Sequence, residues 1–306
     1  MIDNDNVIDI PSLQWYPGHM RKAERFVREK LKLVDVVVEL LDARIPLSSA
    51  NPVLREIICG KPCLVVLNKA DLADTAATHM WVKYFMQQGI KAVPVDAVKG
   101  RGVKELVQEI AKLAKPKTDK LVQHGAKSRA ARCMILGIPN VGKSSLINRL
   151  SGGARTKVEN RPGVTRSKQW IRIGTSIELL DMPGILWPKF EDQKAALHLA
   201  FTGAINDRVY DVGRVVLLLL KAIRTRYPSS LYERYHLTGE LPQDTILLEE
   251  IGKKRGCLRT GGEIDYEKAE QIILTDFRSG RLGRITLDFL PESPSHTSDE
   301  SFRNTL

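Results

Sequence analysis

The chain has 306 residues, 43% of them hydrophobic, which is enough for one large or two moderate domains with a proper core. Lys and Arg outnumber Asp and Glu by 47 to 36, and the excess lies almost entirely within residues 1–200. A confined basic excess indicates a polyanionic partner such as nucleic acid, although a basic surface without a partner explains the charge alone equally well. The four cysteines are too few for a disulfide framework, and the longest apolar run, residues 215–220, is too short to span a bilayer. The first ten residues are acidic and show neither a signal-peptide nor a transit-peptide pattern. We therefore expect no membrane span and a cytoplasmic, reducing location.

Apolar strands and amphipathic helices alternate along residues 34–180, which predicts a doubly wound, mainly parallel α/β sheet with helices on both faces. Strands are expected at residues 34–41, 63–67, 91–95 and 132–136, followed by antiparallel neighbours at 168–173 and 176–180. Helices are expected at residues 75–88, 102–114 and 143–150, with a charged surface linker at 115–131. After residue 193 the pattern is helical, and its last helix is expected to begin at the N-cap Asp265 and to end at Gly280. The predicted parts are 1–190, a nucleotide-binding domain, 191–290, an all-α domain, and 291–306, a disordered tail.

The stretch GIPNVGKS, from Gly137 to Ser144, matches the phosphate-loop pattern G-x-x-x-x-G-K-[ST] between an expected strand and an expected helix. Such a loop turns its backbone N–H groups toward phosphate oxygens, and the helix start adds partial positive charge. Lys143 is expected to reach the β- and γ-phosphates, Ser144 to ligate Mg²⁺, and Ser145 to lie near the α-phosphate.

The stretch LNKAD follows a second buried strand, and its acid, Asp71, identifies the base. A carboxylate there accepts hydrogen bonds from guanine N1–H and the 2-amino group, whereas adenine offers no such pair of donors. Lys69 is expected over the ring, and Asn68 is expected to tie this loop to the phosphate loop. The backbone N–H of Ala97 is expected to face guanine O6, beside Asp96 where related loops usually carry Ser.

Two later segments complete a GTP site. In DMPG, Asp181 is expected to hold Mg²⁺ through water and Gly184 to meet the γ-phosphate, while Thr165 in RPGVTR is the other expected Mg²⁺ ligand. A plain loop threonine is the alternative for Thr165. The residues assigned to GTP are Asn68, Lys69, Ala70, Asp71, Asp96, Ala97, Asn140, Val141, Gly142, Lys143, Ser144, Ser145, Thr165 and Gly184.

The base-reading segments come before the phosphate loop, the reverse of the usual GTPase order. Termini of a compact doubly wound domain lie close together, so joining them and cutting the chain elsewhere preserves the fold. The sequence therefore predicts a circularly permuted P-loop GTPase, joined through residues 115–131 and cut after DMPG.

In this order, the motifs WYPGHM, DARIP, LNKAD, GIPNVGKSS, RPGVTR and DMPG resemble those of the circularly permuted GTPases that assemble ribosomes, in particular the ribosome biogenesis GTPase A family. The resemblance covers residues 14–290 or so. It implies GTP hydrolysis stimulated by the precursor of the large ribosomal subunit, and a C-terminal helical bundle that touches rRNA.

The residue after the DMPG glycine is Ile185, which cannot position an attacking water as a glutamine does in other GTPases, so unstimulated hydrolysis should be slow. The resemblance implies that His19 supplies this function and that Asn140 helps to hold K⁺. For His19, an RNA contact or a packed turn remains open, and for Asn140, a side chain that stabilises the loop.

Basic clusters at residues 21–32, 112–132 and 152–172 together fit an rRNA partner. Taken alone, the first is better explained as a solvated amphipathic helix and the second as a flexible linker. The favoured function is a GTPase of late large-subunit assembly that binds the pre-subunit with GTP and leaves after hydrolysis. We expect no membrane partner and a monomeric protein. A GTP-regulated RNA-binding module, or a GTPase of small-subunit assembly or tRNA modification, is the alternative.

Overall fold

The computed structural model describes residues 18–58, 60–152, 170–180 and 192–290, with side chains from residue 24 onward. The strands are β1 (Val36–Asp42), β2 (Cys63–Asn68), β3 (Lys91–Val95), β4 (Ala131–Gly137), β5 (Trp170–Ile173) and β6 (Ile177–Leu180). The helices are α1 (Gly18–Lys30), α2 (Pro52–Ile58), α3 (Thr75–Gln87), α4 (Val103–Gln123), α5 (Lys143–Leu150), α6 (Gln193–Phe201), α7 (Val212–Arg226), α8 (Pro228–Tyr235), α9 (Asp244–Lys254) and α10 (Tyr266–Arg278), with short 3-10 turns η2 (Leu31–Leu33) and η3 (Asp207–Val209).

The six strands form one sheet in the order β3-β2-β1-β4-β6-β5, in which only the β5–β6 pair is antiparallel. This confirms the mainly parallel sheet and the antiparallel pair expected from the sequence. All seven residues of β1 are buried, as expected for a central strand with both faces covered.

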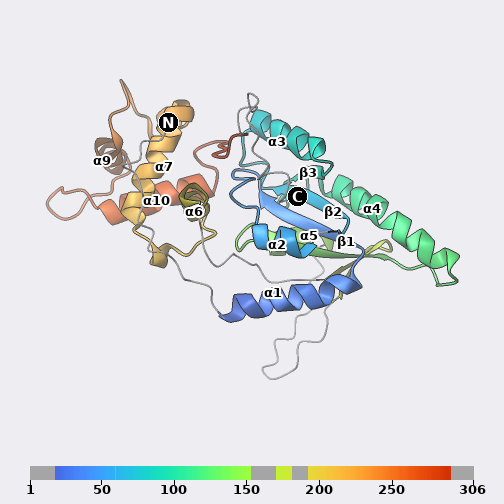
Figure 1. The fold of residues 1–306 in the computed structure, drawn as a ribbon. Coiled ribbons are helices and arrows are strands. Elements are labelled where there is room, and N and C mark those ends of the chain that lie inside the picture. Colours follow the sequence, from blue (N-terminus) through green and yellow to red (C-terminus); the bar gives the residue numbers. More distant parts are fainter. Residues whose placement is uncertain (1–17, 59, 153–169, 181–191, 291–306) are drawn as a thin grey trace, which may run out of the picture.

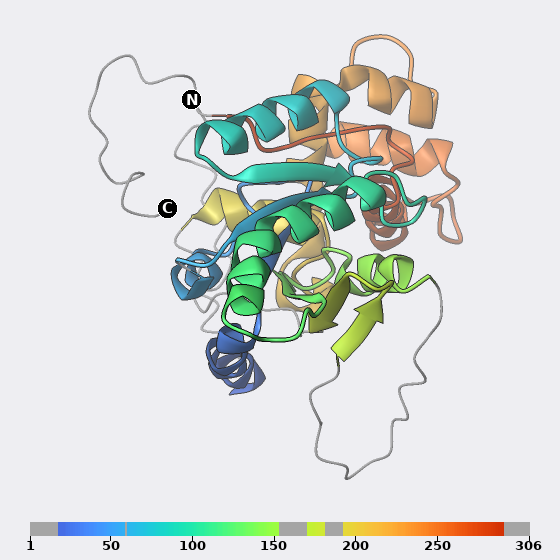
Figure 2. The ribbon, with the colours of Figure 1, turned by 90° about the vertical axis from the view of Figure 1, so that its right-hand side faces the viewer.

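Helices cover both faces of the sheet. Successive side chains of a strand point to opposite sides, so neighbouring residues of β1 pack against different helices. Val38 of β1 packs in the cluster that contains residues of α4 and α5. Its neighbour Val37 packs with α1 and α2, and Leu41 packs with α3. Figure 2, turned by 90° from Figure 1, brings α4 to the front of the sheet.

The fourth helix corrects one expectation. The sequence predicted a linker from residue 115, but α4 continues through Pro116 to Gln123. Thr118 donates to the carbonyl oxygens of Ala114 and Lys115, and Lys117 Nζ lies 2.8 Å from the buried Asp35 carboxylate. These contacts hold the turn that the proline weakens, so the surface segment that joins the permuted halves starts only at residue 124.

The helices after residue 192 gather beside the sheet (Figure 1), and the hydrophobic cluster on one face of the sheet continues into them through Phe201, Val216 and Ile273. The chain then returns to the sheet: Ile285 N donates to Leu72 O at 3.0 Å and Leu287 N donates to Arg44 O at 2.8 Å. The division at residue 190 stays a prediction, and these bonds join its two sides. Among the described residues, no helix is both long and apolar enough to cross a membrane.

Candidate nucleotide site

The carboxyl ends of the central strands bring the base-reading and phosphate-binding segments to one edge of the sheet. In the parallel registers, Asp42 of β1 lies opposite Asn68 of β2, and Leu40 lies opposite Gly137 of β4. Asn68 in turn lies opposite Val95, the last residue of β3. The loops that follow these strands therefore start side by side, as at the ligand-binding edge of other doubly wound sheets.

The phosphate loop leaves β4 and enters α5 with Lys143 as the first helical residue. Lys143 Nζ donates to the carbonyl oxygens of Gly137 at 3.0 Å and of Ile138 at 2.7 Å, so its ammonium lies within the curve of the loop. Gly142 has a φ of 99°, and a Cβ there would come within 2.3 Å of Asn68 Nδ2. The loop therefore needs glycine here, both for its backbone angle and for the approach of the base-reading loop.

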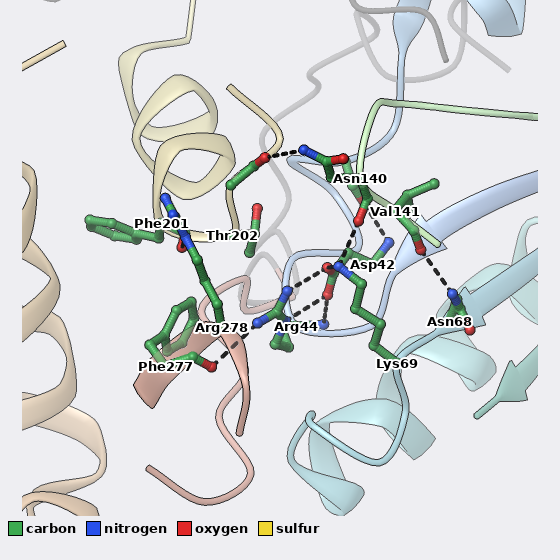
Figure 3. A network of polar contacts seen from close by, with 12 residues as sticks. Asp42, Arg44, Asn68, Lys69, Asn140, Val141, Phe201, Thr202, Phe277 and Arg278 are labelled. Atoms are coloured by element: carbon green, nitrogen blue, oxygen red, sulfur yellow. Dashed lines mark hydrogen bonds and ion pairs between the residues drawn. The ribbon is translucent and has the colours of Figure 1, made fainter. Parts of the chain in front are cut away.

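Two hydrogen bonds join the base-reading loop to the phosphate loop (Figure 3). The buried Asn68 donates through Nδ2 to Val141 O at 2.8 Å, and Lys69 Nζ donates to Asn140 O at 2.8 Å. Sequence reasoning expected the first bond, and the structure places it between residues that lie 73 positions apart. Together the two bonds hold these two distant segments of the chain against each other.

The other residues that the sequence predicts to read the base lie around this junction. Ala70 N donates to Val95 O at 3.1 Å, which fixes the turn before the partly exposed Asp71. In the loop between β3 and α4, residues 96–102, which we call the second base loop, Asp96 Oδ1 accepts from Lys99 N at 2.8 Å, so Asp96 bonds the backbone of its own loop. Ala97 is buried at the start of this loop.

Arg149 lies in α5, the helix that follows the phosphate loop, and its side chain contacts the second base loop. The sequence did not predict this contact. Arg149 Nε donates to Ala97 O at 3.2 Å, and its Nη2 donates to Val98 O. Only the tertiary fold brings α5 beside this loop, so no local pattern indicated the contact.

A second missed feature is the ion pair of Asp42 and Arg44, within the motif DARIP. Asp42 Oδ1 accepts from Arg44 Nε at 2.9 Å, while Oδ2 accepts from Arg44 Nη2 at 2.8 Å and lies 2.9 Å from Lys69 Nζ. Burial by itself would raise the pKa of Asp42, but the two cations outweigh it and hold the pKa well below its ordinary value. Burial lowers the pKa of Lys69, and the Asp42 carboxylate opposes that shift. The available signal was that Asp42 directly follows the apolar run 34–41, which was expected to form a strand.

The expected metal and catalytic residues are only partly within the described residues. Ser144 and Ser145 occupy the exposed first turn of α5, and Asn140, with a φ of 56°, donates through Nδ2 to Gly203 O at 2.7 Å. Thr165, Asp181, Gly184 and Ile185 lie outside the described residues, as does the side chain of His19, whose backbone is in α1. Among the residues that the structure does describe, no cluster of three His, Cys, Asp or Glu side chains could hold a metal ion.

The chain is similar to known proteins over nearly its whole length. Residues 132–239 match the family model described as 50S ribosome-binding GTPase. The ribosome biogenesis GTPase A of Bacillus cereus is 50% identical over 288 residues, which cover 94% of this chain and 97% of that protein. The protein of the same name from Thermotoga maritima is 30% identical over 297 residues, covering 95% and 99% of the two chains.

A solved structure agrees with these sequence relatives. The crystal structure of GNP-bound YlqF from T. maritima has 26% sequence identity and a TM-score of 0.58, and the match covers 87% of this chain and 97% of that one. The family is thereby shown, together with the permuted P-loop GTPase fold predicted from the order of the motifs. The chain belongs to the ribosome biogenesis GTPase A family and is a GTP hydrolase.

Proposed function

We propose that this GTPase acts in late assembly of the large ribosomal subunit, binding the precursor particle and its rRNA in the GTP state and leaving after stimulated hydrolysis. The observation that carries the proposal is the junction of residues 68–71 with residues 137–145, through the bonds of Asn68 to Val141 O and of Lys69 to Asn140 O. It holds the segment that we propose to read guanine against the segment with the phosphate-loop pattern. The names of the relatives support a ribosomal particle as the partner.

The nucleotide site fits GTP or GDP with Mg²⁺. Asp71 is proposed to accept from guanine, Ala97 N to donate to O6, and Lys143 to reach the phosphates. Ser144 and Thr165 would ligate Mg²⁺ directly and Asp181 would hold it through a water molecule; the ion would screen the phosphate charge when bound. Asn140 donates a hydrogen bond through Nδ2 to Gly203 O, so its amide oxygen is the atom suited to bind K⁺.

The basic surface supports an RNA partner. On α4 and the segment after it, Lys112, Lys115, Lys120 and Lys127 are exposed, and on α1 the Arg25 side chain is 86% exposed. Several phosphate contacts by such side chains would make binding to rRNA steeply dependent on salt. Residues 1–190 are proposed as the GTP-binding domain and 191–290 as the helical domain that touches rRNA.

Co-sedimentation with isolated large and small subunits tests the proposal. With a non-hydrolysable GTP analogue the chain should sediment with large-subunit precursors, and with GDP it should remain in the supernatant. Sedimentation with small subunits alone would favour small-subunit assembly, and binding to free RNA without any GTP turnover would favour a GTP-regulated RNA module.

Catalysis is proposed to depend on the partner, because Ile185 cannot position the attacking water. His19 is proposed to supply this function once the particle is bound. The variant His19→Ala should keep its GTP affinity and lose the turnover stimulated by large subunits, measured in K⁺ and in Na⁺ buffers. Unchanged stimulated turnover would exclude His19 from the reaction.

The permuted chain path is proposed to connect the γ-phosphate to the helical domain. After Gly184 only a short segment leads to Asp192, whose side chain caps α6 by accepting from Lys194 N at 2.8 Å. Rearrangement of this segment on GTP hydrolysis should therefore move α6. Solution scattering of the GTP-analogue and GDP forms, free and bound to the subunit, should show two orientations of the helical domain, and identical profiles would contradict the proposal.

A further inference from the structure

The ion pair of Asp42 and Arg44 lies where the nucleotide site meets the C-terminal helices (Figure 3). Asp42 is at the carboxyl end of β1, between the strands that lead to the base-reading loop and to the phosphate loop. Its side chain is 2% exposed and that of Arg44 is 1% exposed. Groups this deeply buried are held by their partners, so a change at one of them is felt by the other.

On the nucleotide side, the pair positions Lys69. Asp42 Oδ2 lies 2.9 Å from Lys69 Nζ, which also donates to Asn140 O of the phosphate loop. Lys69 has a φ of 58°, a left-handed conformation that needs support from its surroundings. Asp42 is therefore a positioning residue for the lysine expected over the guanine ring.

On the other side, the pair contacts the end of α10. Arg44 Nη1 donates to Phe277 O at 3.5 Å, and its guanidinium carbon is 5.2 Å from the centroid of the Phe277 ring. Leu287 N donates to Arg44 O at 2.8 Å, so the segment after α10 is attached to the same residue. These contacts form a first arm, which runs from Lys69 through Asp42 and Arg44 to Phe277.

A second arm reaches the same place from the phosphate loop. Asn140 Nδ2 donates to Gly203 O at 2.7 Å, just after α6. Arg278, the neighbour of Phe277, donates to Ala200 O at 2.9 Å and to Phe201 O at 3.0 Å, which fastens the end of α6 to the end of α10. Both halves of the nucleotide site are thus attached to one junction of α6 and α10.

We propose that the Asp42–Arg44 pair couples occupancy of the guanine site to the docking of the α6–α10 junction, an inference that rests on the nucleotide site proposed above. Ordering the base-reading and phosphate loops around a nucleotide orders both arms. Coupling of this kind is reciprocal, so loosening the junction weakens nucleotide binding by the same factor. Both arms start at loops that contact the base and the proximal phosphates, so GDP suffices, in contrast to the γ-phosphate route through residues 181–192.

Hydrogen exchange of the full chain, with and without GDP and Mg²⁺, tests the coupling. GDP should slow exchange in peptides that cover residues 198–206 and 272–282. In Arg44→Lys, which keeps the charge and loses the paired guanidinium contacts, protection of 272–282 should disappear and the Kd for GDP should rise roughly tenfold, equivalent to about 1.4 kcal/mol.

The matched control is Arg129→Lys. Arg129 forms the same two-point contact with an aspartate, Asp35, at 2.7 and 3.0 Å, but at the amino end of β1, away from the nucleotide edge and from α6 and α10. This variant should keep the wild-type Kd and the GDP-dependent protection.

Two results would overturn the coupling. One is a wild-type chain that binds GDP without any change in exchange at residues 272–282, a comparison that needs no folded variant. The other is an equal Kd for Arg44→Lys and Arg129→Lys. A wild-type chain that binds no guanine nucleotide would instead remove the proposed nucleotide site itself, and the coupling with it.

Discussion

Replacing Gly142 by alanine tests the contact between the two distant segments of the nucleotide site. The added Cβ would come within 2.3 Å of Asn68 Nδ2, and Asn68 is buried, so the amide has to move away from Val141 O. A left-handed alanine costs about 1–2 kcal/mol, and a buried carbonyl that loses its donor costs roughly 1–3 kcal/mol more.

The glycine at residue 152 provides the control for backbone strain. It also has a positive φ, 71°, but a Cβ there meets nothing within 4 Å. Gly152→Ala should therefore lose only about 1–2 kcal/mol of unfolding free energy and bind GDP normally. If the nucleotide-bound form requires the contact of Asn68 with Val141 O, restoring that contact on binding costs the same further amount, about 1–3 kcal/mol, and GDP affinity falls roughly 5- to 150-fold.

Titration with a fluorescent GDP derivative, together with urea unfolding of both variants, measures the two quantities separately. If Gly142→Ala binds GDP within twofold of Gly152→Ala, the contact between Asn68 and the phosphate loop does not shape the site, and the reasoning is wrong.

Two further predictions concern charge. Burial by itself would raise the pKa of Asp35, but hydrogen bonds from Arg129 and Lys117 lower it from 3.8 to about 2. A lowered pKa means that the stabilisation is present above about pH 4 and is lost as the pH falls through 2, and at 1.36 kcal/mol per unit it amounts to about 2 kcal/mol. Asp35→Asn should thus be less stable than the wild type at pH 7, with a difference that shrinks in acid in urea unfolding; a difference independent of pH would contradict this. Asp71→Asn should lose GDP affinity by at least about 100-fold and gain affinity for xanthosine diphosphate, whose O2 accepts from an amide, in competition titrations. Retained preference for GDP would show that Asp71 does not read the base.

The strands and the phosphate loop could be predicted from the sequence because their signals are local. The run 91–95 is β3, and the helix at 143–150 is α5, with the expected bounds. Asp265 was expected as an N-cap, and its side chain accepts from Lys268 N at 3.2 Å. Local hydrogen bonds and alternating burial leave a pattern within a few residues.

Contacts between distant segments were less predictable. Asn68 was expected to meet the phosphate loop only because a two-motif pattern carries that information, whereas Arg44 and Phe277, 233 positions apart, carry no shared pattern. The continuation of α4 through Pro116 was missed for a related reason: its support comes from Asp35, which follows η2 far upstream. Tertiary partners decided both outcomes, and local propensity could not reveal them.

Calorimetric titration of the full chain with GDP and with ADP, in buffer with Mg²⁺, tests the central claim most directly. If residues 68–71 and 137–145 form one guanine site, GDP should bind with one-to-one stoichiometry. ADP should bind at least about a thousandfold more weakly, because adenine lacks the N1–H and 2-amino groups from which Asp71 accepts hydrogen bonds. Equal affinities for the two nucleotides, or no heat with either, would contradict the account.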